Sequence, residues 1–176
     1  SINSKHKKEK SRLEIIITPL VFGIGSVLTA SVGINVGAQQ LHRAKMIAWT
    51  GAFISFCVVG LLGATVTIFP DIWLNNFESS TLIRDYATSY LIIVAPFYCF
   101  FAAGQTLYFA SQGLGKIFYP VIVGIIRLLS VSIICFYATV YDLSLNFVFY
   151  GVSFGLLATG LGLWMCMLGP DWKKRI

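Results

Sequence analysis

Three polar side chains recur every seven residues in a segment that is otherwise apolar. They are Tyr98, Gln105 and Gln112, in "APFYCFFAAGQTLYFASQGLGK". Residues seven apart in an α-helix lie two turns from each other on one face. A polar stripe on a membrane helix either lines a wet cavity or hydrogen-bonds to neighbouring helices. We take the three residues as candidates for lining a substrate cavity, with inter-helix hydrogen bonding as the alternative.

Arg127, in "VGIIRLLSV", is the one unambiguous charge inside an apolar run of the sequence. It follows Pro120 by seven residues, so it lies on the order of 10 Å into a helix that begins there. From that depth a long side chain can snorkel to the surface or form a structural pair. A charge that faces the bundle interior instead contacts substrate. We keep both interpretations and add Arg127 to the cavity candidates.

Other chemistry has little support in the sequence. Glu14 stands at the edge of an apolar run beside Arg12, and no Asp or Glu stands in the middle of one. His6 and His42 have no carboxylate or cysteine at a catalytic spacing, and no nucleophile or phosphate-binding motif is present. The four cysteines form no metal-ligating cluster. We therefore predict no catalytic residues, no metal, no cofactor and no enzyme activity.

The composition predicts a membrane protein. Hydrophobic residues make up 57% of the 176 residues and charged residues 11%, whereas soluble domains carry about 25% charged residues. About 20 apolar residues in a helix cross the hydrocarbon core of a bilayer. Five segments qualify, which predicts an all-α polytopic transmembrane helical bundle: 14–37, 46–69, 86–110, 118–140 and 147–168.

Basic residues flank these segments and account for the net charge of +6. Residues 1–13 form a basic N-terminal segment, which we expect to be a truncation edge because Ser1 is not an ordinary translation start. Residues 169–176 form a basic C-terminal tail. Short basic caps are typical of helix ends at the membrane surface. No long basic segment is interleaved with aromatics, so we expect no nucleic-acid partner.

A small-residue motif closes the first segment, in "SVGINVGAQQLHRAK". Gly33 and Gly37, four residues apart, let helix backbones approach closely. We expect Asn35 to hydrogen-bond across that contact, although it could instead line a vestibule. Arg43 and Lys45 are expected to anchor the following turn to the membrane surface, which the resemblance described next implies to be cytoplasmic.

Four stretches together resemble the multidrug and toxic compound extrusion (MATE) family, from about Ser11 to at least Arg127. They are "SRLEIIITPLVFGIGSVLTASVGINVGAQQLHRAK", "FPDIWLNNF", "APFYCFFAAGQTLYFASQGLGK" and "YPVIVGIIRLLS". The resemblance implies helices eight to twelve of a two-lobe, twelve-helix transporter. Such a protein exports organic, often cationic, substrates in exchange for sodium ions or protons by alternating access between its lobes.

The resemblance also sets expectations about partners. The neighbourhood of residues 100–103, where some members carry an acid, is apolar here, so the coupling ion is expected to bind the absent N-terminal lobe. The partners are then the lipid bilayer, that lobe and small organic substrates, and the location is a bacterial inner (plasma) membrane. We expect no transport by this chain alone. The alternatives are a lipid or oligosaccharide flippase of related architecture and a non-transporting membrane scaffold.

Overall fold

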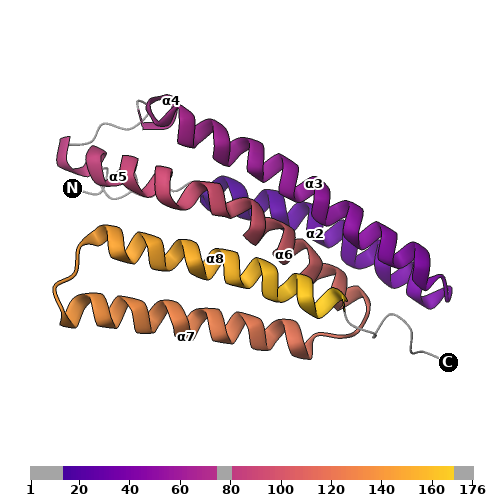
Figure 1. Cartoon of the computed structure of the whole chain (residues 1–176). Helices are drawn as coiled ribbons and strands as arrows, with labels where there is room; N and C mark the ends of the chain where they lie inside the picture. The colour runs from indigo at the N-terminus through magenta and orange to yellow at the C-terminus, as the bar shows by residue number, and fades with distance from the viewer. Residues whose placement is uncertain (1–13, 75–80, 169–176) are drawn as a thin grey trace, which may run out of the picture.

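The computed structural model describes residues 14–74 and 81–168, which form α-helices joined by short turns (Figure 1). Within these ranges there is no strand. The basic N-terminal segment and the basic C-terminal tail predicted above lie outside the described residues. The elements, in chain order, are α2 (Glu14–Gly37), α3 (Leu41–Ile68), α4 (Pro70–Leu74), α5 (Thr81–Val94), the 3₁₀ turn η1 (Ala95–Phe97), α6 (Tyr98–Gly113), α7 (Phe118–Val140) and α8 (Leu145–Leu168).

The predicted all-α fold with five spans is confirmed by the lengths and compositions of the helices. Each candidate span has at least 21 residues, enough to cross a hydrocarbon core about 30 Å thick at 1.5 Å per residue. The five candidate spans are Ile17–Gly37, Leu41–Ile68, Arg84–Gly113, Phe118–Val140 and Leu145–Leu168.

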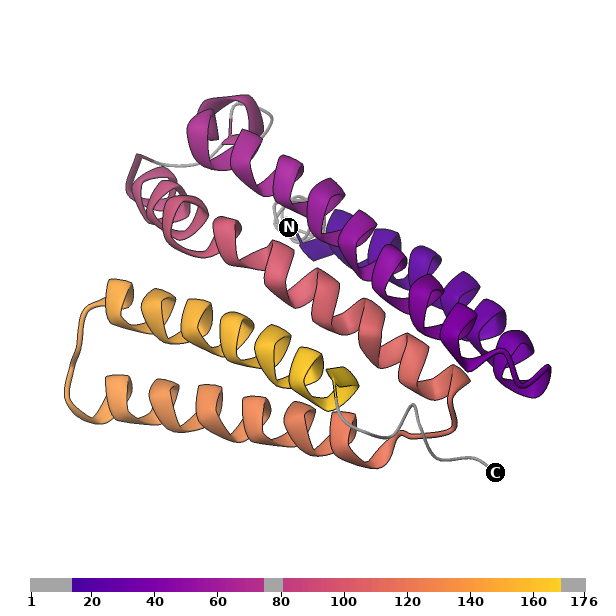
Figure 2. The ribbon, with the colours of Figure 1, turned by 45° about the vertical axis from the view of Figure 1, so that its right-hand side comes forward.

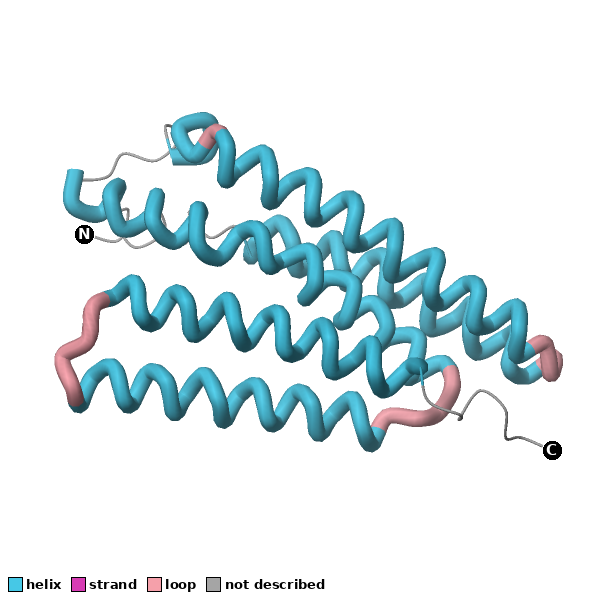
Figure 3. The backbone as a smooth tube through the Cα atoms, viewed as in Figure 1, coloured by secondary structure: helices cyan, strands magenta, loops and turns pink. Residues whose placement is uncertain are grey.

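The turn between the first two spans is shorter than the sequence indicates. Hydropathy predicts a basic turn over 38–45, but only residues 38–40 are non-helical, and α3 begins at Leu41 (Figure 3). Arg43 and Lys45 therefore lie on the first turns of α3. Lys and Arg are good helix formers, so a helix can continue past the point where its sequence stops being apolar.

The third span contains a break that joins α5 to α6. Pro96 lies in η1, where its missing N–H and rigid ring interrupt α-helical hydrogen bonding. The α3 backbone approaches this break closely, because a Cβ added at Gly63 would lie 2.7 Å from the carbonyl oxygen of Ala95. The break is therefore held against a neighbouring helix.

The helices are arranged around α6, which packs on α2, α3 and α8. In Figures 1 and 2, α2 and α3 lie on one side of α6, and α8 separates it from α7. Helix α7 packs chiefly on α8. We call the end that holds the 38–40 turn and the end of α8 the Arg43 end. The opposite end, with α4 and the turn after α7, is the Asp71 end.

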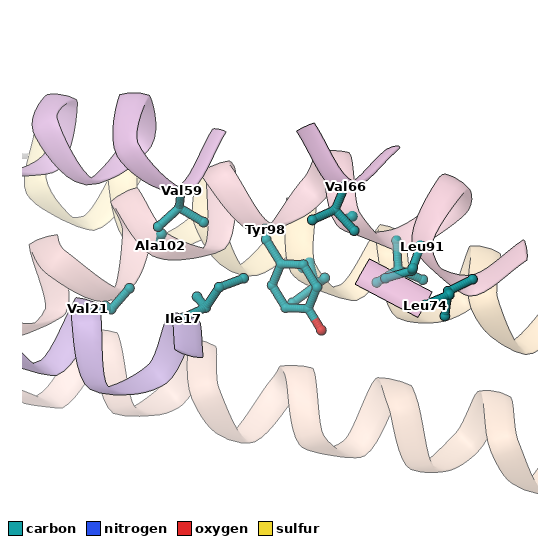
Figure 4. Packing of buried hydrophobic residues seen from close by; sticks show 11 residues of the cluster. Ile17, Val21, Val59, Val66, Leu74, Leu91, Tyr98 and Ala102 are labelled. Atoms are coloured by element: carbon teal, nitrogen blue, oxygen red, sulfur yellow. The ribbon is translucent and has the colours of Figure 1, made fainter. Parts of the chain in front are cut away.

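Two apolar clusters form the core. The first lies around the α5–α6 break (Figure 4) and includes Ile17, Val59, Val94, Tyr98 and Ala102. The second cluster lies near the Arg43 end and combines the larger side chains of Val32, Leu107 and Met167 with five alanines. The alanines are Ala44, Ala48, Ala52, Ala103 and Ala110. Small residues let membrane helices pack backbone to backbone, which is how α6 comes to lie in the middle.

Candidate substrate site

The Arg127 side chain reaches from α7 to α6. Its guanidinium carbon lies 4.5 Å from the centre of the Phe101 ring, and both side chains are half-buried. A cation over an aromatic face is attracted by about 0.5–2 kcal/mol, depending on how far water is excluded. This contact directs the charge of α7 toward the centre of the bundle. The sequence indicated the arginine but gave no sign of its aromatic partner.

Gln105 follows Phe101 by one turn of α6 and is also half-buried. Residues four apart share a helix face, so Gln105, Phe101 and the guanidinium of Arg127 belong to one surface, which we call the α6–α7 surface. Gln112 is half-buried as well and lies two turns further along α6, about 10 Å from Gln105. This surface offers an aromatic face, an amide and a positive charge.

Tyr98 occupies a different environment from the other three candidates. Its side chain is 3% exposed and belongs to the core cluster shown in Figure 4. Its hydroxyl oxygen lies 2.7 Å from that of Tyr90, and the Tyr90 ring meets Phe149 edge-on with centroids 5.4 Å apart. In this conformation Tyr98 is a packed residue whose polar atom pairs with another tyrosine, and it lies on no open wall.

The small-residue motif of α2 packs differently from the prediction. A Cβ added at Gly33 would lie 3.6 Å from the Gly113 carbonyl oxygen, whereas one at Gly37 would meet nothing within 4 Å. The tighter position is Gly113 on α6, where an added Cβ would lie 2.6 Å from the Thr29 carbonyl oxygen. Asn35 Nδ2 donates to the Ser31 carbonyl 2.8 Å away, within its own helix. That bond stays within α2 and does not reach a neighbouring helix. The close contacts between α2 and α6, at Thr29 and Gly33, lie before the last turn of α2.

Three hydroxyl groups connect helices in places that the sequence did not indicate. Thr106 Oγ1 on α6 donates to Ser55 Oγ on α3 at 2.8 Å. Thr29 Oγ1 lies 2.9 Å from the Phe109 carbonyl oxygen, and Ser153 Oγ lies 3.0 Å from the Ile93 carbonyl oxygen. Each of these hydroxyls also lies within hydrogen-bond distance of a carbonyl one turn earlier in its own helix. Because most membrane Ser and Thr make that local bond, a sequence cannot distinguish the few that also reach a neighbour.

The described carboxylates lie away from the middle of the spans. Asp71 and Asp85 are exposed at the Asp71 end, and Asp71 Oδ1 accepts a hydrogen bond from Arg84 Nη2 at 2.6 Å. Ala102 and Ala103 on α6 are completely buried, and neither side chain has an oxygen that could bind an ion. Among the described residues no three His, Cys, Asp or Glu side chains gather into a metal site.

Comparison with known proteins supplies the family. The MatE family model matches residues 11–138, well over half of the chain, from the region of α2 into α7. Searches of curated proteins and of solved structures give no match. The resemblance noted in the sequence is thus confirmed, and with five apolar helices the chain is an integral membrane protein. The chain belongs to the MATE family of membrane efflux transporters, which are not enzymes.

Proposed function

We propose that these five helices are part of a secondary active multidrug efflux transporter. It exchanges organic, often cationic, substrates for sodium ions or protons by alternating access, in a bacterial plasma membrane. The family match over residues 11–138 carries this proposal. Transporters of this kind bind substrate between two repeats that rock against each other. We therefore propose that a second lobe completes the substrate cavity.

The coupling ion is proposed to bind that second lobe. A bound sodium ion or proton needs a carboxylate or a set of oxygen ligands in the membrane. Along the described spans, carboxylates lie only toward the ends, and Ala102 and Ala103 are completely buried apolar residues. These helices would then contribute substrate contacts and the moving framework, with no ion site of their own.

The α6–α7 surface is the proposed substrate contact of this chain. The ring of Phe101 offers an aromatic face, and the amide of Gln105 both donates and accepts hydrogen bonds. An aromatic substrate stacked near Phe101 would compete with the guanidinium of Arg127 for the ring. Arg127 would thus change partners during transport, binding Phe101 in the empty state and the substrate or another group in the loaded state.

A lipid or oligosaccharide flippase is the second candidate, and Arg127 is the observation that favours it. A guanidinium binds phosphate oxygens through two parallel hydrogen bonds. A guanidinium at this depth in α7 would attract an anionic headgroup and repel an organic cation. The two candidates thus differ in the sign of charge that the α6–α7 surface attracts.

The test measures ion-driven flux in proteoliposomes. An antibody against the tail "GPDWKKRI" first identifies the complete polypeptide in source membranes, and that polypeptide is purified and reconstituted. We expect an imposed sodium or proton gradient to drive efflux of a cationic dye, and we expect the 176-residue chain alone to give none. Movement of a lipid-linked oligosaccharide without dye efflux would select the flippase. Absence of both fluxes, with a fixed co-purifying protein, would refute transport and favour a scaffold.

A further inference from the structure

An open groove of about 720 Å³ lies between α2 and α3, away from the α6–α7 surface. Its walls are mostly aliphatic, and Arg43 is the single charged side chain among the residues that line it. Nothing in the sequence pattern indicated this groove. The lining residues are Gly23, Ile24, Val27, Leu28 and Ser31 from α2, and Arg43, Met46, Ile47, Thr50, Gly51 and Ile54 from α3.

Glycine creates much of the hollow. A Cβ added at Gly23 would meet nothing within 4 Å, so a larger side chain there would project into the groove. Across the groove, Leu28 packs against the backbone of Gly51, with a side-chain carbon 2.7 Å from where a Cβ would lie. The floor is therefore a tight α2–α3 contact, and the space above it is open. The rim residues Val27 and Ile54 are 65% and 47% exposed.

The groove has the length of one bilayer leaflet. Its α3 wall runs from Arg43 to Ile54, which is about 16 Å at 1.5 Å per residue. Half of a hydrocarbon core about 30 Å thick is about 15 Å. Arg43 is exposed two residues after the start of α3, where the chain meets the membrane surface. The groove thus extends from the surface at the Arg43 end to near the middle of the bilayer.

We propose that this groove binds one anionic phospholipid, with its phosphate on the Arg43 guanidinium and an acyl chain along α2 and α3. A guanidinium pairs with phosphate oxygens bidentately, and the single charge at the mouth complements an anionic headgroup. An acyl chain restores the dispersion contacts that an empty apolar groove lacks. The lipid would act as a fixed part of the α2–α3 hairpin, and it is a separate ligand from any transported substrate.

Lipid selectivity at Arg43 is the first test. The complete polypeptide is reconstituted in nanodiscs of equal phosphatidylglycerol and phosphatidylcholine, and the lipids that stay bound after transfer to detergent are counted by native mass spectrometry. We expect Arg43→Gln to lower the retained ratio of phosphatidylglycerol to phosphatidylcholine about five-fold, the effect of one basic residue near an anionic surface. Lys45→Gln is the matched control, because it removes the same charge from the same end but does not line the groove.

Filling the groove is the second test. We expect Gly23→Leu to reduce retained lipid of both headgroups severalfold, and Gly23→Ala to reduce it less. Gly124→Leu on α7 is the control, since an added Cβ at Gly124 also meets nothing within 4 Å. Equal losses for Arg43→Gln and Lys45→Gln would overturn the proposal in favour of general surface attraction. Unchanged lipid retention in Gly23→Leu would also overturn the proposal. A third contrary outcome is that the variants change only the oligomeric state of the protein, as measured by mass photometry, which would assign the groove to a second copy of the chain.

Discussion

Helices α6 and α7 are both long enough to help cross a bilayer, yet they relate to the bundle in opposite ways. Helix α6 packs on three long helices, whereas α7 packs chiefly on α8. The buried residues of α6 include Ala102, Ala103, Gly104 and Ala110. Those of α7 are Pro120 and Ala138, while its large side chains are mostly exposed. Small residues thus mark the central helix, and large aliphatic residues mark the peripheral one.

This difference separates stability from function. Lipid tails are as apolar as Leu, so a helix gains no transfer free energy from turning large apolar side chains inward, and its stability in the bundle comes from close packing. The energy that holds the bundle together is therefore concentrated at α6. Helix α7 can present its exposed face to lipid or to a further helix. Its contact with α6 is made by Arg127, whose guanidinium lies over the Phe101 ring. Four predictions test this division.

The largest effect is expected where α6 meets α8. A Cβ at Gly104 would lie 2.8 Å from Gly160 Cα, so Gly104→Leu forces two backbones apart. Overpacking typically costs 1–3 kcal/mol and sometimes more, and with backbone as the obstacle we expect more than about 3 kcal/mol. Gly124→Leu on α7 should change stability by less than about 0.5 kcal/mol, because open space surrounds it. Thermal unfolding in detergent measures both, and equal melting temperatures would break the comparison.

The same substitution in the two helices gives the second test. Leu107 on α6 is completely buried, whereas Leu128 on α7 is 68% exposed. Leu→Ala in soluble cores costs about 2–5 kcal/mol. Since transfer into lipid replaces transfer into water here, we expect Leu107→Ala to cost about 2 kcal/mol. We expect Leu128→Ala to cost less than about 0.5 kcal/mol. A larger loss for Leu128→Ala in a denaturant titration would show that α7 is covered by protein.

How much the sequence predicts follows the same division. Hydropathy reports transfer into lipid, and that is sufficient for five spans and the all-α class. It does not report which helix is central, because burial between helices and exposure to lipid both accept apolar residues. The hydroxyl pair of Tyr90 and Tyr98 illustrates this limit. Heptad spacing placed Tyr98 on a polar stripe, but its hydroxyl forms a hydrogen bond with that of Tyr90 on α5, inside the core. The small residues of α6 were the available sign of its central place.

Replacing Arg127 should separate function from stability on α7. On biological insertion scales an arginine at mid-helix costs about 2.5–3.5 kcal/mol, so we expect Arg127→Met to be produced at equal or higher levels. Transport by the complete protein should nevertheless fall severalfold, because the charge over Phe101 is lost. Arg127→Lys should retain part of the activity, since an ammonium also binds an aromatic face. Dye-efflux rates normalised to folded protein provide the measurement, and normal efflux by Arg127→Met would exclude Arg127 from the site.

The smallest effect concerns the hydroxyl contacts that cross from α6 to its neighbours. Thr106→Val removes the bond to Ser55, which is 2.8 Å long and completely buried. Side-chain hydrogen bonds between membrane helices contribute about 0.6 kcal/mol on average, so a double-mutant cycle with Ser55→Ala should give a coupling energy near that value. On α7, Thr139 Oγ1 bonds the Cys135 carbonyl in its own helix, and Thr139→Val should show no coupling to Ser55→Ala. A coupling energy indistinguishable from zero for Thr106 would mean that glycine and alanine packing alone holds α3 against α6.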